Sequence, residues 1–454
     1  MDTAFKRSFH CGCGQEHNAR IRGYIAESGA IERLSDCVRQ CGGSRAFLLA
    51  DGNTYKAAGE AVCANLRRNG IPYSLCILDG TVPEPDETTV GAAILRFDRS
   101  CDVVVGIGSG GINDIGKIVS HTAGTPYIIV ATAPSMDGYA SATSSVVRDG
   151  LKVSLPSRCA DYILGDLDIL AKAPARMLMA GLGDMLAKYI SLGEWKIAHI
   201  ITGEYYCETV ADMVRTALRA CTDHADGLLR REPAAVKAVF EGLVIGGVAM
   251  NYAGVSRPAS GVEHYFSHVW DMRGLEFGTP VDLHGIQCAV GTLYAAQIYD
   301  RLRNYTPDAE KAAGYAEHFD YGAYQARLSA FLGKGAQAMI ALEEKEQKYN
   351  PEKHRARLQR IVTHWDAIEA VIRQEIPTAR TVETILDRIH APKTAEDIGI
   401  DPAVLPMTFE ATKDIRDKYV LSRLCFDLGI LPEVSAAVFG NVWRDGGKEA
   451  PRAG

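Results

Sequence analysis

Strand-like and helix-like segments alternate from residue 46 to about residue 165, and this alternation most constrains the fold. Stretches at 54–68 and 112–122 place apolar residues at helical spacing. Between them lie short apolar runs typical of buried strands, at 46–50, 73–78, 102–107 and 127–130. Strands separated by helices pair in parallel through right-handed crossovers. The sequence therefore predicts an α/β domain built on a parallel sheet.

Beyond about residue 170 the strand signals largely vanish, and Ala, Leu, Glu, Lys and Arg dominate. The pattern predicts helices at 174–192, 206–230, 233–251, 285–303 and 354–375. The heavily charged segment 341–360 is interpreted as a solvated helix or a protruding linker. A chain of 454 residues is long for one core. We expect an α/β domain at 1–170 and an all-α domain at 171–454, with the substrate between them.

The charge balance argues against a nucleic-acid-binding protein, because the net charge is −7. The sequence shows no secretory signal pattern and no apolar run long enough to span a membrane. Its twelve cysteines are mostly scattered. We therefore expect a cytoplasmic protein with mostly reduced thiols and no membrane insertion.

Cys11, Cys13 and His17 form the exception to this scattering. A CxC pair with one nearby histidine lacks the second ligand pair of a common zinc module. The group therefore favours an N-terminal turn with free thiols, and a small metal clip is the alternative. No role in the function is assigned to it.

A glycine-rich turn over 106–111 follows the strand at 102–107 and opens the next helix. Glycines let the backbone approach a phosphate, and a helix N-terminus offers free N–H groups and a partial positive charge. The turn therefore indicates a nucleotide pyrophosphate site. Its spacing departs from the common dinucleotide fingerprint, so a tight strand-to-helix turn is the alternative.

Two further segments support a dinucleotide. The hydroxyl-rich stretch 132–141 follows the next strand, where its side chains could reach a pyrophosphate or ribose. Asp51 closes the strand at 46–50 and could accept hydrogen bonds from the adenosine ribose. An acid there would repel a 2′-phosphate, which favours NAD over NADP. Alternatively, Asp51 is only a turn residue.

Asp184, His264 and His284 are candidate ligands of a divalent metal with one position left open. Small, glycine-rich surroundings at two of the three positions permit close approach. His268 follows His264 by four residues and shares its helix face, so it is either a second ligand from that helix or a substrate-facing group. Imidazole and carboxylate suit zinc, nickel or ferrous iron.

At these residues the chain resembles the sn-glycerol-1-phosphate dehydrogenase family, its bacterial branch in particular. That family belongs to the iron-containing alcohol dehydrogenase-like, dehydroquinate synthase-like superfamily. The matching pieces are 108–114, 132–141, 181–184, 257–268, 284–285, 415–419 and 428–429. The likeness spans roughly residues 20 to 435, and the long, charged region after residue 300 departs from it.

The resemblance implies a role for each matching position. Asp184, His264 and His284 would hold the metal, and Asp137 and His268 would contact the substrate. Catalysis would rest on Asp184, His264, His268 and His284. With Asp51, the cofactor candidates are Gly108, Gly110, Gly111, Ile112, Asn113, Asp114, Thr132, Ala133, Pro134, Ser135 and Ser141.

The implied reaction is interconversion of dihydroxyacetone phosphate and sn-glycerol 1-phosphate with NAD(H), or NADP(H), and one divalent metal as Lewis acid. His268 or a water chain would relay the proton, or His268 would only orient a ligand. Lys188 and Arg257 are candidates for the substrate phosphate; salt bridges or surface solvation are their alternatives. The family also implies a homodimer or higher homo-oligomer and a place in ether-lipid or prenyl-glycerol synthesis.

Three rival functions stay open. A glycerol dehydrogenase would act on an unphosphorylated polyol, and a dehydroquinate synthase-like lyase would recycle NAD. A non-catalytic nucleotide-binding protein would have lost the chemistry, although the complete Asp/His/His set argues against it.

Overall fold

The computed structural model describes residues 8–80 and 83–440 and confirms the predicted parallel sheet. Its six strands run in the order β3-β10-β7-β6-β4-β5, and every neighbouring pair is parallel. β4, β6 and β7 are buried along their whole length, as expected of central strands flanked by helices. The strands are β3 Gly23–Glu27, β4 Ala46–Asp51, β5 Tyr73–Leu78, β6 Val103–Gly108, β7 Tyr127–Ala131 and β10 Tyr162–Asp166.

Short helices cover this sheet. The predicted helix at 54–68 begins earlier, because the Asp51 side chain caps the chain at Gly52 and a π-helical turn precedes the regular helix. The helical elements are η1 Ala30–Arg33, α1 Leu34–Gln40, α2 Gly52–Thr54, η2 Tyr55–Gly59, α3 Glu60–Arg68, α4 Glu87–Leu95, α5 Gly110–Ala123, η3 Gly138–Ala140 and α6 Leu167–Leu170.

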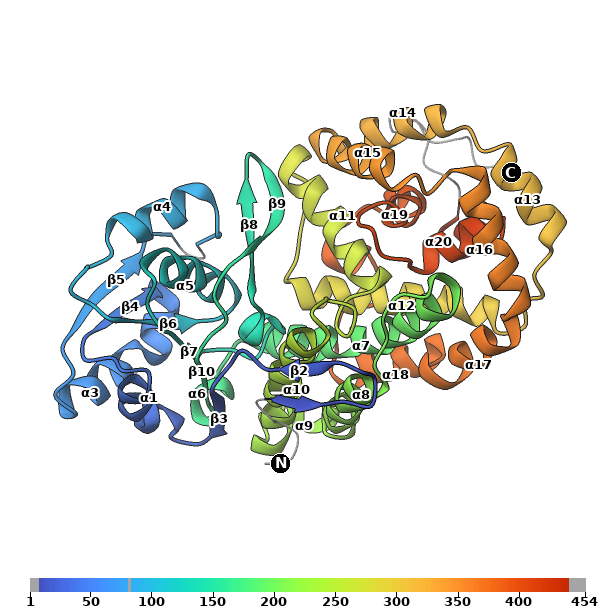
Figure 1. The fold of residues 1–454 in the computed structure, drawn as a ribbon. Helices are drawn as coiled ribbons and strands as arrows, with labels where there is room; N and C mark the ends of the chain where they lie inside the picture. Colours follow the sequence, from blue (N-terminus) through green and yellow to red (C-terminus); the bar gives the residue numbers. More distant parts are fainter. Residues whose placement is uncertain (1–7, 81–82, 441–454) are drawn as a thin grey trace.

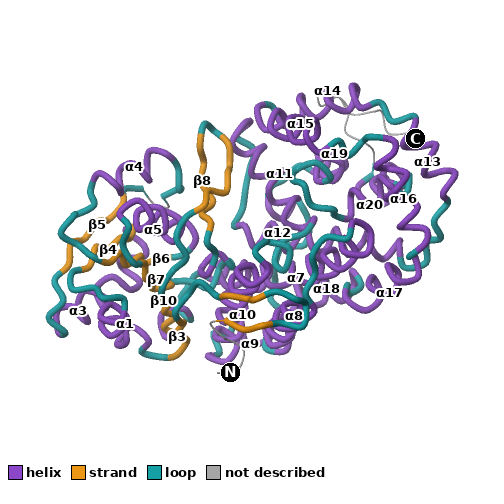
Figure 2. Tube along the Cα trace, viewed as in Figure 1, coloured by secondary structure: helices purple, strands orange, loops and turns teal. Residues whose placement is uncertain are grey.

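From residue 171 to residue 440, all of which are described, the regular structure is entirely helical, as predicted. Figures 1 and 2 show the strands of the six-stranded sheet gathered on one side of the molecule and these helices filling the other. The longer helices are α7 Ala175–Thr202, α8 Glu208–Asp223, α10 Pro233–Ala253, α11 Val262–Phe277, α12 His284–Leu302, α14 Tyr321–Leu332, α15 Lys334–Glu346, α16 Pro351–Thr363, α17 Trp365–Glu375 and α18 Ala379–Arg388. The shorter ones are α9 Ala225–Leu228, α13 Ala309–Glu317, η4 Glu396–Ile398, η5 Pro402–Val404, α19 Leu405–Thr412, α20 Leu421–Asp427 and α21 Leu431–Phe439.

Three predicted segments are divided in the structure. The stretches 206–230 and 354–375 each form two helices, because His224 and His364 adopt non-helical backbone angles between them. The charged segment 341–360 is neither one helix nor a linker. It contains the end of α15, a turn, and the start of α16, where Asn350 caps the helix and Pro351 occupies its first turn.

Two antiparallel hairpins were not predicted. β8 Thr143–Arg148 and β9 Leu151–Pro156 project between the α/β and helical parts, where β9 contacts α11 (Figure 1). β1 Ser8–His10 and β2 Glu16–Asn18 form the other hairpin, and β2 contacts α10 of the helical part. The N-terminal hairpin thus precedes the sheet in sequence but packs outside it.

Among the described residues, α10 alone is long and apolar enough to cross a membrane by length and composition. However, 78% of its most apolar window is buried inside the fold. Its environment is that of a core helix.

Candidate metal centre and active site

The metal-ligand candidates depend on an unusually close contact between α7 and α12. A Cβ atom on Gly183 would lie 2.3 Å from the Gly285 carbonyl oxygen, and one on Gly285 would lie 2.0 Å from the Ala180 oxygen. A Cβ atom cannot lie so close to a carbonyl oxygen, so glycine is required at both positions. The contact places Asp184 of α7 and His284 of α12 next to each other.

α11 delivers His264 to the same point. The Val262 N–H at its first turn donates to Glu194 Oε2 over 3.0 Å, and the Gly261 N–H donates to Glu263 Oε1 over 2.7 Å. Both carboxylates are buried and satisfy free N–H groups at the positive end of the helix. These bonds fix the start of α11 and therefore the position of His264.

The structure brings the three predicted ligands together and adds a fourth residue, Cys288. One ligand atom from each of Asp184, His264, His284 and Cys288 lies within 4.8 Å of all the others. His264 Nε2 is 3.5 Å from Asp184 Oδ1, and the two imidazole centroids are 5.0 Å apart. Cys288 Sγ lies 3.5 Å from His284 Nε2. Cys288 follows His284 by one helical turn, a spacing that could have identified it.

Neighbouring polar groups orient the two imidazoles. His264 Nδ1 is 2.8 Å from Glu263 Oε1, so this nitrogen donates to the carboxylate and Nε2 is left for a metal. His284 Nδ1 is 3.0 Å from Ser267 Oγ, which in turn accepts from the Gln287 side chain. This is the usual environment of metal-binding histidines.

Protonation states also fit a cation site. Burial would raise the pKa of Asp184, but the Lys188 ammonium and the His264 hydrogen bond hold it well below its usual range. Burial and the charge on His264 lower the pKa of His284 to about 4. Burial opposes charge on His264, yet Cys288 and Asp184 raise its pKa. The carboxylate is thus ionised and His284 neutral at neutral pH.

Lys188 and Asp137 both form hydrogen bonds with Asp184, one of the metal-ligand candidates. The Lys188 ammonium is fully buried and donates to Asp137 Oδ2 over 2.6 Å and to Asp184 Oδ1 over 3.0 Å. Burial would lower its pKa, but Asp137 and Asp184 raise it. The Asp137 N–H donates to Asp184 Oδ2 over 2.9 Å. The two bonds made by Asp137, from Lys188 and to Asp184, tie the loop after β7 to α7.

His268 lies one turn after His264 and stacks on His284 at 6.1 Å between ring centroids. Burial lowers its pKa well below the ordinary value, and the charges of His284, Arg416 and Lys152 act in the same direction. Lys152 and Arg416 come from β9 and from the loop before α20. Sequence reasoning missed both cations, since nothing local connects them to residue 268.

The two predicted cofactor turns lie together at the carboxyl ends of β6 and β7. The Thr132 N–H donates to the Gly108 carbonyl over 3.0 Å, and the hydroxyls of Ser109 and Ser135 are 2.5 Å apart. A Cβ on Gly108 would lie 2.5 Å from Ile112, which explains this glycine sterically. The remaining candidates, Gly110, Gly111, Ala133, Pro134 and Ser141, lie on the same two segments.

Polar candidates in these turns also have structural partners. The Asn113 amide donates to the Gly138 carbonyl over 3.0 Å, and Asp114 pairs with the buried Lys117 over 2.9 Å. Asp51 accepts hydrogen bonds from the Asn53 and Thr54 N–H groups. These bonds order the turns, and contact with a cofactor stays a prediction for each of them.

Arg257 lies outside the cluster described above. It is buried, donates to the Tyr419 carbonyl over 2.8 Å and forms an ion pair with Glu204 over 2.6 Å. The geometry is that of a structural ion pair, one of the alternatives considered for this residue.

The chain is similar to several known proteins. Residues 25–174 match the family model described as iron-containing alcohol dehydrogenase. The chain is 29% identical to glycerol-1-phosphate dehydrogenase [NAD(P)+] of Halalkalibacterium halodurans, over 93% of this chain and 96% of that protein. It is 32% identical to the enzyme of the same name from Methanosarcina acetivorans, over 64% of this chain and 81% of that protein.

Solved structures show the same fold. Glycerol dehydrogenase from Schizosaccharomyces pombe superimposes with a TM-score of 0.57 at 17% sequence identity, covering 92% of this chain and 89% of that one.

Proposed function

Because the chain belongs to the glycerol-1-phosphate dehydrogenase family, we propose that it interconverts dihydroxyacetone phosphate and sn-glycerol 1-phosphate with NAD(H) or NADP(H). The observation that carries the proposal is the cluster of Asp184, His264 and His284. The Asp137 N–H, which follows the turn at 132–135, donates a hydrogen bond to Asp184 and so joins this cluster to the predicted cofactor turns. One divalent ion and one nicotinamide cofactor, when bound, would supply Lewis acidity and hydride.

The protein's own groups have distinct tasks in this proposal. Asp184, His264 and His284 hold the cation, and Cys288 lies close enough to be a further ligand. Lys188 balances the charge of Asp137 and Asp184, which are both within hydrogen-bonding distance of its ammonium. His268 is neutral at pH 7 because of its lowered pKa, so it can accept or relay a proton beside the substrate.

We propose that Arg416 and Lys152 bind the substrate phosphate. Their charges act on the His268 imidazole, and Arg416 is exposed. Lys152 is held over 2.6 Å by Asp271 at the contact between β9 and α11. Arg416 is better placed than Lys188 and Arg257, whose charges are already paired in the interior.

The chain also has a surface suited to self-association. β5 is an edge strand, and Leu75 and Ile77 on it are each 38% exposed. α4 packs beside β5 and exposes Ile94 and, to 88%, Leu95. Apolar edge strands are normally covered, so we propose a homodimer or higher homo-oligomer through this edge. Light scattering of the Ile77→Lys variant, expected to be monomeric, tests it.

We propose the cytoplasm as the compartment. All twelve cysteines are free thiols, which suits a reducing environment. Fractionation of cells that express the full chain would test this, and recovery outside the cytoplasmic fraction would contradict it.

The activity is tested by NADH oxidation with chelator-stripped protein, before and after addition of zinc, nickel or ferrous iron. Dihydroxyacetone phosphate and dihydroxyacetone are compared in parallel. Metal-dependent turnover that strongly favours the phosphorylated ketone is expected. Turnover of dihydroxyacetone alone would indicate a glycerol dehydrogenase, and no net NADH consumption with either would reopen the lyase and binding-protein alternatives.

A further inference from the structure

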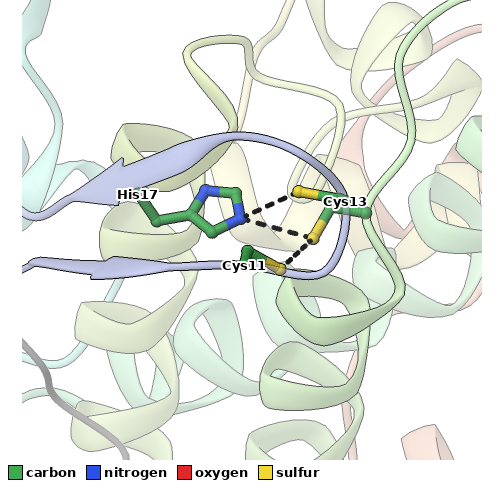
Figure 3. Close-up of side chains that lie close together, drawn as sticks. Cys11, Cys13 and His17 are labelled. Atoms are coloured by element: carbon green, nitrogen blue, oxygen red, sulfur yellow. Dashed lines mark hydrogen bonds between the residues drawn. The ribbon is translucent and has the colours of Figure 1, made fainter.

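The turn of the N-terminal hairpin gathers three potential metal ligands beside a fourth from a distant helix. Cys11, Cys13 and His17 lie close together in the hairpin, with the imidazole directed at the sulfur atoms (Figure 3). Cys207, the residue that precedes α8, completes the group, and one ligand atom from each residue lies within 4.8 Å of all the others. Sequence reasoning expected free thiols here because the fourth ligand was missing.

The distances between the ligand atoms are close to those expected around a tetrahedrally coordinated zinc ion. Cys11 Sγ and Cys207 Sγ are 3.7 Å apart, and His17 Nε2 is 3.4 Å from both Cys13 Sγ and Cys207 Sγ. Zinc–ligand bonds of about 2.3 Å to sulfur and 2.0 Å to nitrogen at tetrahedral angles give roughly 3.8 Å between sulfurs and roughly 3.5 Å between sulfur and nitrogen. Three observed separations lie within a few tenths of an ångström of these values.

His17 is held in the form that a metal requires. Its ring is fully buried, and Nδ1 lies 2.8 Å from the Tyr252 carbonyl oxygen, to which it must donate. Nε2 therefore carries the free lone pair and faces the sulfurs. Phe9 and Tyr252 pack against the ring at 5.0 and 5.7 Å between centroids and fix its plane.

A helix N-terminus and two hydroxyl groups lie beside the sulfur atoms of this group. Cys207 occupies the N-cap position of the 16-residue helix α8, at the positive end of the helix dipole. The Thr209 hydroxyl lies 3.4 Å from Cys11 Sγ, and the Tyr205 hydroxyl lies 3.3 Å from Cys13 Sγ. Both hydroxyls can donate to a metal-bound sulfur.

We propose that Cys11, Cys13, His17 and Cys207 bind one structural zinc ion that fastens the N-terminal hairpin to the helical part. Three thiolates and one imidazole fill a tetrahedral shell and leave no position for substrate, which distinguishes this site from the cluster around Asp184. Binding releases the protons of the thiols to solvent and involves no change of oxidation state. The proposal is independent of the proposed enzymatic activity.

The test measures zinc per chain in full-length protein purified with zinc and reductant and then desalted. In a His284→Ala background, which weakens the Asp184 cluster, the protein is expected to retain one equivalent. Adding Cys13→Ser or Cys207→Ser should reduce this to near zero, whereas Cys41→Ser, a change to a cysteine outside both clusters, should not. Retention of the full equivalent in Cys207→Ser protein would overturn the proposal.

A second measurement does not require those variants to fold. Cobalt(II) added to metal-free wild-type protein should produce the near-ultraviolet sulfur-to-cobalt charge-transfer absorption of a multi-thiolate tetrahedral site. His17→Cys should retain this band, because cysteine is also a zinc ligand, and His17→Gln should weaken cobalt affinity. Absence of the band in reduced wild-type protein, or a Cys11–Cys207 disulfide in protein isolated without oxidant, would contradict the zinc site.

Discussion

Gly183 and Gly285 face each other across the α7–α12 contact, with the Gly285 carbonyl oxygen 2.3 Å from the place that a Gly183 Cβ would take. Each glycine adjoins a metal-ligand candidate, Asp184 in one case and His284 in the other. The separation of the two ligands is therefore set by the absence of two methyl groups.

Replacing Gly183 with alanine should force α7 and α12 apart. Overpacking of this kind costs about 1–3 kcal/mol, and the displaced ligands should also lower metal affinity. Thermal unfolding and metal content check both effects. Gly314→Ala is the matched control, because a Cβ there meets nothing within 4 Å and a helical Gly→Ala change is expected to be neutral or stabilising. Equal behaviour of the two variants would contradict the steric account.

His264→Ala should abolish turnover while NADH binding largely survives, since His264 lies in the metal cluster and the cofactor turns lie on other segments. Steady-state kinetics and NADH fluorescence titration measure the two properties. His318→Ala, at the exposed histidine that follows α13, should leave both unchanged. Loss of NADH binding with metal retained would count against this assignment.

Metal affinity should rise with pH. Without metal, His264 is protonated at neutral pH because its pKa is raised, whereas His284 is already neutral because its pKa is about 4. The ion must displace the His264 proton, so the Kd should tighten about tenfold per pH unit between roughly pH 5 and 7.

Nickel titrations in the Cys207→Ala background, with buffers of different ionisation enthalpy, report the released proton. A Kd that does not change over this range would show that His264 is not protonated in the metal-free state.

Arg416→Ala should lower kcat/KM for dihydroxyacetone phosphate by roughly 10- to 100-fold, the cost of one charge-assisted contact. Activity on dihydroxyacetone should hardly change, since that ketone has no phosphate. Arg355→Ala, at an exposed arginine of α16, is the control. Equal losses on both ketones would remove Arg416 from the phosphate site.

Asp51→Asn should shift cofactor preference towards NADPH. Asparagine keeps the helix cap that Asp51 provides but removes the charge that would repel a 2′-phosphate. The ratio of kcat/KM for NADPH and NADH measures the shift, and unchanged thermal stability shows that the cap survives. An unchanged ratio would exclude Asp51 from the cofactor site.

Local pattern was sufficient for β4, β5, β6 and β7 and for their parallel pairing, since runs such as 103–107 are apolar, β-branched and buried on both faces. It missed β3 and β10 of the same sheet and both hairpins. β1 is short, and β9 is half-buried or exposed along its length, so neither has a strong alternating signal. The Asp184, His264 and His284 grouping, predicted from motifs, is present as a cluster.

Sequence could not supply partners that only tertiary packing brings near. Cys207 joins Cys13 from 194 positions away in the chain, and Arg416 reaches the surroundings of His268 from a loop near the end of the helical part. Lys188 follows Asp184 by one helical turn, but its ion pair with Asp137 comes from a loop that the local sequence does not connect to it.

The N-terminal hairpin has a consequence for the order in which the protein is made. His17 meets its partner Tyr252 only across 235 residues of chain. During synthesis, residues 8–18 therefore leave the ribosome long before α8 and α10 exist, and their docking must wait until the middle of the chain has emerged. Closing so long a loop costs slightly more entropy than pairing β3 with β10, the most widely separated strands of the sheet. Docking of this hairpin therefore waits for the middle of the chain, and an N-terminal fusion would act on a segment that is made first but docks only after α8 and α10 have been made.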